Sequence, residues 1–127
     1  VLFRSRLRQT RLAKGMTIRD LAKTVGMTPE AISSLEAGRT TASLPNLRKL
    51  AQVLGVPIAY LGCFEKLPEN TLGQKIAKAR MYHGLTKKEF ARLIGINVKT
   101  LRSWEQDKNK PLKEHLNKLE SYLAILL

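Results

Sequence analysis

The side chains of this sequence that could do chemistry are mostly basic. Lysine and arginine number 23 against 10 aspartates and glutamates, which gives a formal charge of +13. The charge is +7 up to Lys66 and +6 beyond it, so it does not come from a basic tail on a neutral domain. Ammonium and guanidinium groups in such excess attract phosphates or an anionic membrane surface. The sequence therefore predicts a polyanionic partner.

Catalytic and metal-binding chemistry finds little support. The sequence has no Gly-rich phosphate loop, no HExxH and no GxSxG motif. His83 and His115 lie on helical patterns without a carboxylate or cysteine at ligand spacing, and Cys63 is the single cysteine. We therefore expect no enzyme, no cofactor, no metal site and no disulfide, in keeping with a reducing cytoplasm.

The elements that must position the basic residues are duplicated. Sliding the sequence against itself gives one gapless register, at an offset of 69, in which residues 11–54 and 80–123 share eleven identities. Chance would give roughly three over that length at average composition. The identical pairs are Arg11/Arg80, Gly15/Gly84, Thr17/Thr86, Ala22/Ala91, Gly26/Gly95, Ser34/Ser103, Glu36/Glu105, Leu47/Leu116, Lys49/Lys118, Leu50/Leu119 and Leu54/Leu123. One small domain is used twice, and we expect it over residues 1–62 and again over 70–127, with a connector over 63–69.

Each copy is predicted to be a bundle of four to five short helices. Apolar residues recur at helical spacing, and glycines such as Gly15 and Gly26 follow the helical segments. Thr17 and Thr86 have the side chain of an N-cap, with an acidic residue three positions later, as in a capping box. No segment alternates with period two for long enough to form a strand. The sequence therefore predicts an all-α fold.

A helix, a glycine-containing turn and a second helix follow one another in each copy, over 17–35 and 86–104. This is the helix-turn-helix arrangement. The strings Arg11-Leu-Ala-Lys-Gly-Met-Thr17 with Ile32-Ser-Ser-Leu-Glu-Ala-Gly38, and Arg80-Met-Tyr-His-Gly-Leu-Thr86 with Leu101-Arg-Ser-Trp-Glu-Gln-Asp107, resemble the Xre/Cro-type, lambda-repressor-like family. The two matches cover nearly the whole chain, so the resemblance implies two tandem bundles of this family.

The resemblance implies sequence-specific binding of double-stranded DNA by a repressor-like transcriptional regulator. Recognition helices at about 28–36 and 97–105 would enter the major groove. The DNA-binding positions, with their immediate neighbours, are Thr17, Thr28, Glu30, Ser34 and Arg39 in the first copy, and Thr86, Lys87, Asn97, Val98, Lys99, Thr100, Arg102, Ser103, Lys108 and Lys110 in the second. Thr28 and Asn97 have the alternative role of plain helix caps, and a lysine such as Lys99 that of solvated surface.

The resemblance also implies two structural ion pairs. Arg11 and Glu36 are 25 residues apart, and so are Arg80 and Glu105. In the family, arginine and glutamate at these positions join the first helix to the end of the recognition helix. A partly buried bidentate pair would fix one helix against the other. The doubling of the spacing argues against four unrelated surface charges.

The first copy departs from the family pattern. A glutamine that contacts DNA usually follows the threonine, but Ile18 and Lys87 stand at this position. Isoleucine cannot hydrogen-bond a phosphate, and Pro29 and Glu30 are poor at reading guanine, although glutamate can accept from cytosine N4. The formal charge differs over six matched surface positions. It is 0 in the first copy, over Ile18, Thr28, Glu30, Ser33, Arg39 and Thr41, and +5 in the second, over Lys87, Asn97, Lys99, Arg102, Lys108 and Lys110. The second copy is therefore expected to dominate DNA binding.

A protein-interaction role for one copy stays open, as in an antitoxin or a mobile-element control protein. Phe64 and Leu67 of the connector and the apolar tail from Tyr122 to Leu127 offer surface for a homodimer or another protein partner. The tail is far too short to span a membrane, and the helices lack the wide apolar face of a membrane-surface protein. We expect a cytoplasmic, nucleoid-associated protein. Both chain ends are compatible with a longer parent protein.

Overall fold

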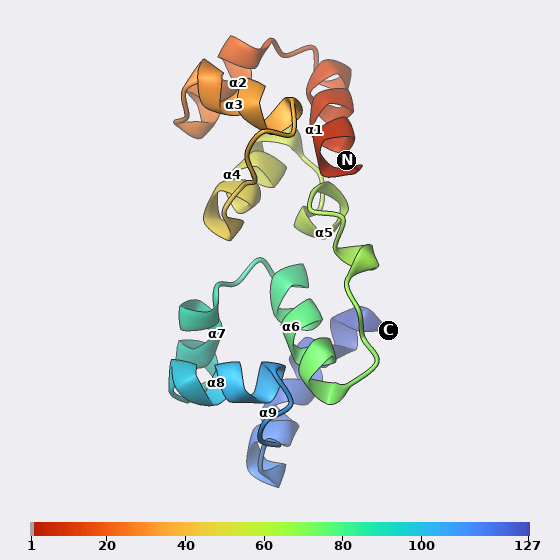
Figure 1. The fold of residues 1–127 in the computed structure, drawn as a ribbon, viewed down its shortest axis with the longest axis vertical. Coiled ribbons are helices and arrows are strands. Elements are labelled where there is room, and N and C mark those ends of the chain that lie inside the picture. The colour runs from red at the N-terminus through yellow and green to blue at the C-terminus, as the bar shows by residue number, and fades with distance from the viewer. Residues whose placement is uncertain (1) are drawn as a thin grey trace. The chain divides into compact units, whose positions relative to one another are not determined.

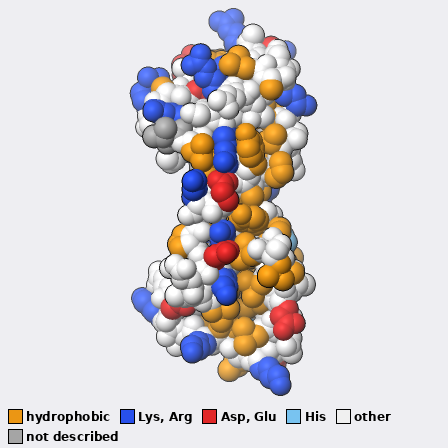
Figure 2. Space-filling model, turned by 90° about the vertical axis from the view of Figure 1, so that its right-hand side faces the viewer, with side chains coloured by type: hydrophobic (Ala, Val, Ile, Leu, Met, Phe, Trp, Pro, Cys, Tyr) orange, Lys and Arg blue, Asp and Glu red, His pale blue; other side chains and the backbone are white. Residues whose placement is uncertain are grey.

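The computed structural model describes residues 2–127, and within this range every regular element is a helix (Figure 1). The predicted all-α class is therefore confirmed. The chain divides between Cys63 and Phe64 into two compact units. Figure 2 shows lysine and arginine side chains exposed on both units, interspersed with acidic and apolar ones.

Over residues 2–63, the first unit contains five α-helices. They are α1 (Leu2–Ala13), α2 (Ile18–Val25), α3 (Pro29–Glu36), α4 (Leu44–Leu54) and α5 (Ile58–Leu61). Helix α2 packs against α3 and α4, while α1 contacts α3 and α5. Every helix contributes at least one apolar side chain to the core, and the fully buried ones include Leu7, Leu21, Ile32, Leu50, Leu54 and Leu61. The apolar positions expected from helical spacing thus point inward.

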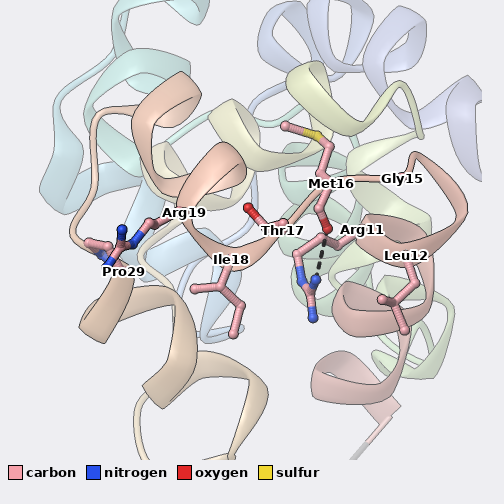
Figure 3. A pocket seen from close by; sticks show the side chains of 8 residues that line it. All are labelled: Arg11, Leu12, Gly15, Met16, Thr17, Ile18, Arg19 and Pro29. Carbon is pink, nitrogen blue, oxygen red and sulfur yellow. Dashed lines mark hydrogen bonds between the residues drawn. The ribbon is translucent and has the colours of Figure 1, made fainter.

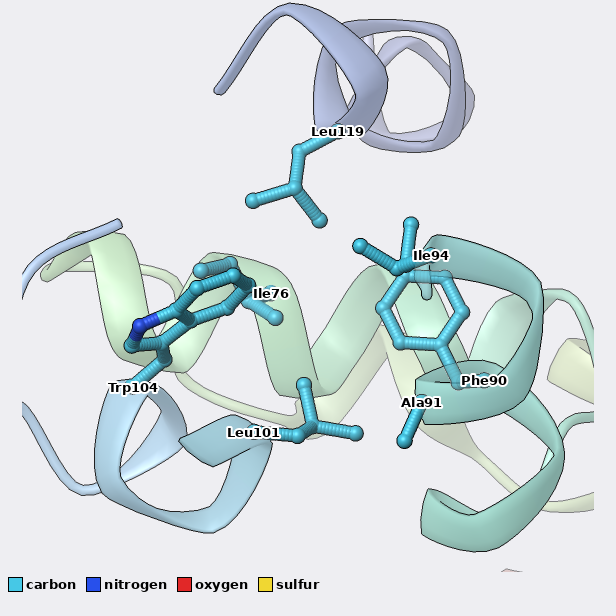
Figure 4. Close-up of a cluster of buried hydrophobic side chains, with 7 residues drawn as sticks. All are labelled: Ile76, Phe90, Ala91, Ile94, Leu101, Trp104 and Leu119. Carbon is cyan, nitrogen blue, oxygen red and sulfur yellow. The ribbon is translucent and has the colours of Figure 1, made fainter. Parts of the chain in front are cut away.

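The second unit repeats this arrangement with four α-helices and two short 3-10 turns. They are η1 (Phe64–Lys66), α6 (Leu72–Tyr82), α7 (Lys87–Ile94), α8 (Val98–Glu105), α9 (Lys113–Leu123) and η2 (Ala124–Leu126). Figure 4 shows Phe90 and Ile94 of α7 converging with Leu101 and Trp104 of α8. Leu119 of α9 closes the cluster from the other side.

Two apolar segments behave differently from expectation. Phe64 is buried, with its ring centroid 6.3 Å from that of Tyr82, so it does not offer the exposed apolar surface expected of the connector. The turn η1, within that connector, lies against α6. The tail is partly folded back, because η2 also contacts α6, while Ile125 and Leu127 stay exposed. Pairing between these elements is long-range, and no local pattern in the sequence reports it.

The turn between the two helices of each motif depends on a glycine. Gly26 and Gly95 adopt φ of +74° and +83°, and each N–H closes the preceding helix by bonding to a carbonyl of α2 or α7. A side chain is strained in this left-handed region, which favours glycine. Each motif can therefore turn within three residues, and its second helix starts close to the end of the first.

An arginine–glutamate fork locks each motif against its first helix. In the first unit, Arg11 Nε donates to Glu36 Oε2 at 2.6 Å and Nη2 donates to Oε1 at 3.0 Å. Arg11 Nη1 also donates to the carbonyl of Met16 at 2.8 Å. The Glu36 carboxylate thereby raises the pKa of Arg11. One guanidinium thus joins α1, the turn before α2 and the last residue of α3.

The second unit contains the same fork. Arg80 Nε and Nη2 donate to the two carboxylate oxygens of Glu105 at 2.8 and 3.2 Å, and Nη1 donates to the carbonyl of Leu85 at 2.9 Å. The Arg80 and Glu105 side chains are only 9% and 7% exposed, and those of Arg11 and Glu36 are both 8% exposed. Because both charges are withdrawn from water, each depends on its partner.

We expect Arg80→Ala and Glu105→Ala each to lower the free energy of unfolding of the second unit by about 3–5 kcal/mol, because each leaves a buried charge unpaired. The double variant should lose less than the sum, since it leaves no lone charge. Denaturant melts of the wild type and the three variants measure this. Strictly additive losses would show that the two side chains do not act together.

Candidate nucleic-acid interface

Helices α2 and α7 begin at closely similar capping boxes. Thr17 Oγ1 accepts from the Asp20 N–H at 3.0 Å, while the Thr17 N–H donates to Asp20 Oδ2 at 3.0 Å. Thr86 and Glu89 form the same reciprocal pair at 3.2 and 2.8 Å. A capping box uses the N–H of the third helical residue and leaves those of the first two for other partners. A phosphate is a suitable partner there, because the helix dipole also favours an anion.

The hydrogen bonds at the first box lower the pKa of Asp20. Its carboxylate accepts the backbone N–H of Thr17 and also interacts with the Thr17 side chain, and both contacts favour the charged form. Asp20 remains fully exposed to solvent. The start of α2 is therefore ordered by a carboxylate that must stay ionised.

Thr28 and Asn97 cap the two recognition helices. Thr28 Oγ1 accepts from the Ala31 N–H at 3.1 Å, and Asn97 Oδ1 accepts from the Lys99 N–H at 2.7 Å. Both residues are exposed at the N-terminal end of their helix. Capping uses their oxygen as an acceptor, whereas the Thr28 hydroxyl proton and the Asn97 amide group can still donate to a base edge or a phosphate.

In the first unit, the candidate residues Glu30, Ser34 and Arg39 come together around a shallow hollow, whereas Thr17 and Thr28 do not line it. Its lining consists of Ile18, Pro29, Glu30, Ser33, Ser34 and Arg39. Ile18 and Pro29 also line a second, largely apolar hollow, which Figure 3 shows between the start of α2 and the end of α1. Leu12 and Met16 lie on its far side. The exposed face of this motif thus combines apolar side chains with the carboxylate of Glu30 and the guanidinium groups of Arg19 and Arg39.

In the second unit, the corresponding helix α8 presents polar and basic side chains. Lys99, Thr100 and Arg102 are exposed, while Leu101 and Trp104 on the opposite side are buried. Lys99 and Arg102 are three residues apart and so share a face. Val98 instead packs against the core and is half-buried. Lys87 at the start of α7 is half-buried, and Lys108 and Lys110 after α8 are exposed.

The loop after α8 contains two polar residues that sequence reasoning missed. Asn109 Nδ2 donates to Ser103 Oγ at 2.6 Å, so the candidate DNA-binding residue Ser103 already has a hydrogen-bond partner within the protein. Asp107 accepts from Thr71 Oγ1 and from the Gly73 N–H, at 2.6 and 3.0 Å. Asp107 stands opposite Gly38 in the repeat, which indicates a left-handed backbone at this position but not the partners of the carboxylate.

Other chemistry-bearing side chains do not assemble into a site. His83 Nε2 lies 3.1 Å from the carbonyl of Tyr122, and the His115 ring packs 5.3 Å from that of Trp104. Among residues 2–127, no three His, Cys, Asp or Glu side chains are grouped so that they could hold a metal ion. Over the same range, no helix is both long and apolar enough to cross a membrane.

Comparison with known proteins identifies the repeated unit. A family model described as Helix-turn-helix matches the chain twice, over residues 7–61 and 76–126. The two matches contain both arginine–glutamate forks and all of the candidate DNA-binding positions. No curated protein and no solved structure matches the chain significantly.

We expect Asp20→Asn to lower the melting temperature of the first unit most strongly at neutral pH. The folded state lowers the pKa of Asp20 below its unfolded-state value of 3.8. The ionised carboxylate therefore stabilises the unit fully at a pH above 3.8, and this stabilisation is lost as the pH falls through the folded-state pKa. The difference between the variant and the wild type should therefore shrink in acid. Glu30→Gln controls for the loss of one exposed charge. A difference that does not change with pH would argue against the capping role.

Proposed function

The chain belongs to the Xre/Cro-type helix-turn-helix family, and on this premise we propose that it is a repressor-like transcriptional regulator that binds specific sites in double-stranded DNA. The family is one of DNA-binding domains rather than of enzymes. The observation that best supports the proposal is the N-capped helix α8, which buries Leu101 and Trp104 and exposes Lys99 and Arg102. Such a regulator would act in the cytoplasm, at the nucleoid.

The second unit offers contacts of two kinds. Asn97 and Lys99, at the start of α8, suit base edges in the major groove, since amides pair with adenine and lysine pairs with guanine. Thr86 and Lys87 at the start of α7, with Lys108 and Lys110 after α8, suit phosphates on the flanking backbone. Thr100 and Arg102 are exposed on α8 and suit either kind of contact, whereas the Ser103 hydroxyl, which accepts from Asn109, suits a phosphate or base only as a donor. We assign sequence specificity to Asn97 and Lys99, and we assign the positioning of the unit on the duplex to the phosphate contacts.

The two units are expected to contribute unequally. The first unit has Thr17, Thr28, Glu30, Ser34 and Arg39 at its candidate interface, with a glutamate where the second unit has Lys99. A carboxylate repels phosphates, although it can accept from cytosine N4. Charge therefore assigns most of the binding free energy to the second unit.

A second candidate function, binding of a protein by the first unit, is favoured by the largely apolar hollow beside Ile18 and Pro29. An antitoxin or a mobile-element control protein would use one unit for DNA and the other for its partner. The second unit offers a further apolar hollow for another protein or a second copy of the chain, lined by Leu72, Leu123, Ala124, Leu126 and Leu127 among others. Figure 2 shows exposed apolar side chains on this unit.

We expect binding to duplex DNA that weakens steeply with salt. If the units contact about 6–10 phosphates, affinity should fall about 10³–10⁵-fold between about 50 and 200 mM salt, because bound cations are released from the duplex. Selection of bound sequences from random duplex DNA, followed by titrations over this range, measures the site and the slope. Failure to bind any duplex at low salt would contradict the proposal.

The second unit should account for most of the affinity. We expect the double variant Lys99→Ala with Arg102→Ala to bind the selected site about tenfold more weakly or worse, since a good side-chain contact to a base contributes about 1–3 kcal/mol. The matched variant Glu30→Ala with Ser34→Ala should change affinity little. Equal losses would show that both units read DNA, and a larger loss in the first unit would reverse the assignment.

A further inference from the structure

The loop that follows α8 is fixed at two points. Asp107, at its start, has φ of +60° and directs both carboxylate oxygens to the N-terminal end of α6, where Thr71 Oγ1 and the Gly73 N–H donate at 2.6 and 3.0 Å. Two residues later, Asn109 Nδ2 donates to Ser103 Oγ of α8 at 2.6 Å. Lys108 lies between these two anchors and Lys110 directly follows the second.

The first anchor depends on an unusually close approach of two helices. A Cβ at Gly73 would lie 2.4 Å from the carbonyl oxygen of Trp104 and 2.7 Å from Asp107 Oδ1, so only glycine fits between α6 and the end of α8. Thr71 relays the contact, because its hydroxyl donates to Asp107 and accepts from the Gln74 N–H at 3.1 Å. The Asp107 charge is therefore balanced at the start of α6, where the helix dipole also favours it.

The first unit closes the same junction with different residues. Arg4 stands opposite Gly73 in the repeat, and its Nη1 donates to the carbonyl of Ala37 at 3.2 Å. Gly38 stands opposite Asp107, and a Cβ there would lie 2.6 Å from Arg4 Nη1. The loop that follows contains Arg39, Thr40 and Thr41 in place of Lys108, Asn109 and Lys110. The carboxylate and amide anchors thus occur in the unit whose loop contains two lysines.

We propose that Asp107 and Asn109 are positioning residues, which hold Lys108 and Lys110 in a phosphate-binding arrangement before DNA arrives. The proposal rests on the DNA-binding function proposed above. A lysine ammonium is a flexible point charge, and binding must normally order both the side chain and the loop beneath it. Anchors that order the backbone in the free protein remove part of this cost, so the two lysines bind phosphates with less loss of entropy.

The test is a double-mutant cycle in the full chain, measured as affinity for one selected duplex at fixed salt. In the wild-type background, Asn109→Ala should weaken binding about three- to tenfold, as expected when one or two side chains must be ordered on binding. In the Lys108→Ala, Lys110→Ala background the same change should cost nothing further. The melting temperature should stay the same, since Asn109 is exposed. Thr40→Ala, at the equivalent position of the first unit, is the matched control and should leave affinity unchanged.

Asp107→Gly gives a second test with an opposite electrostatic expectation. Glycine tolerates the left-handed backbone and is the residue of the first unit at this place. Removing a carboxylate near bound phosphates should tighten binding if charge alone mattered, whereas loss of the anchor should weaken it. Tighter binding by this variant would overturn the proposal. The proposal would also be overturned if Asn109→Ala reduced the affinity equally in the wild-type and the Lys108→Ala, Lys110→Ala backgrounds. It would be overturned likewise if Asn109→Ala caused no loss of affinity while the wild type binds normally. A wild type that binds no duplex would instead refute the proposed function, and this inference with it.

Discussion

Each unit depends on one buried arginine that makes three connections. Arg11 and Arg80 hold a glutamate at the end of the recognition helix with two hydrogen bonds, and a carbonyl of the turn before the second helix with a third. The planar guanidinium fixes direction as well as distance. The recognition helix therefore cannot rotate without breaking a buried charge pair. The positions of the exposed side chains on α3 and α8 follow from this constraint.

The forks, helix caps and inter-helix turns form the frame of each unit. Most of this frame could be predicted from the sequence, because it depends on local or repeated signals. The spacing of 25 residues occurs twice, and so do the threonine caps and the glycines between helices. Caps and left-handed turns involve contacts within a few residues, which residue type alone can indicate. The forks span more residues, and only their duplication together with the family resemblance identified them. The predicted fold class and family are confirmed for this reason.

The features that could not be predicted involve contacts between distant and unrepeated residues. Asp107 bonds to groups 34 and 36 residues away, and no counterpart in the first unit hints at this pairing. The burial of Phe64 results from its packing against α6, where its ring meets that of Tyr82, a residue distant in the sequence. The assignment of base and phosphate contacts remains a prediction, since side-chain type at an exposed position does not by itself determine a partner.

The buried frame is separate from the exposed face, which consists of the exposed side chains at the candidate interface. This separation explains how two copies of one domain can differ so much in charge at the same surface. Frame residues such as Arg80, Glu105 and Leu101 are buried, so changes there remove stability. Face residues such as Glu30 and Lys99 are exposed, and substitutions at such positions usually change the free energy of unfolding by about 0.5 kcal/mol or less. A reversal of charge on the face therefore leaves the fold intact. On the proposed assignment, in which the second unit holds the duplex through phosphates, the first unit can keep apolar and acidic groups that would weaken binding if it acted alone.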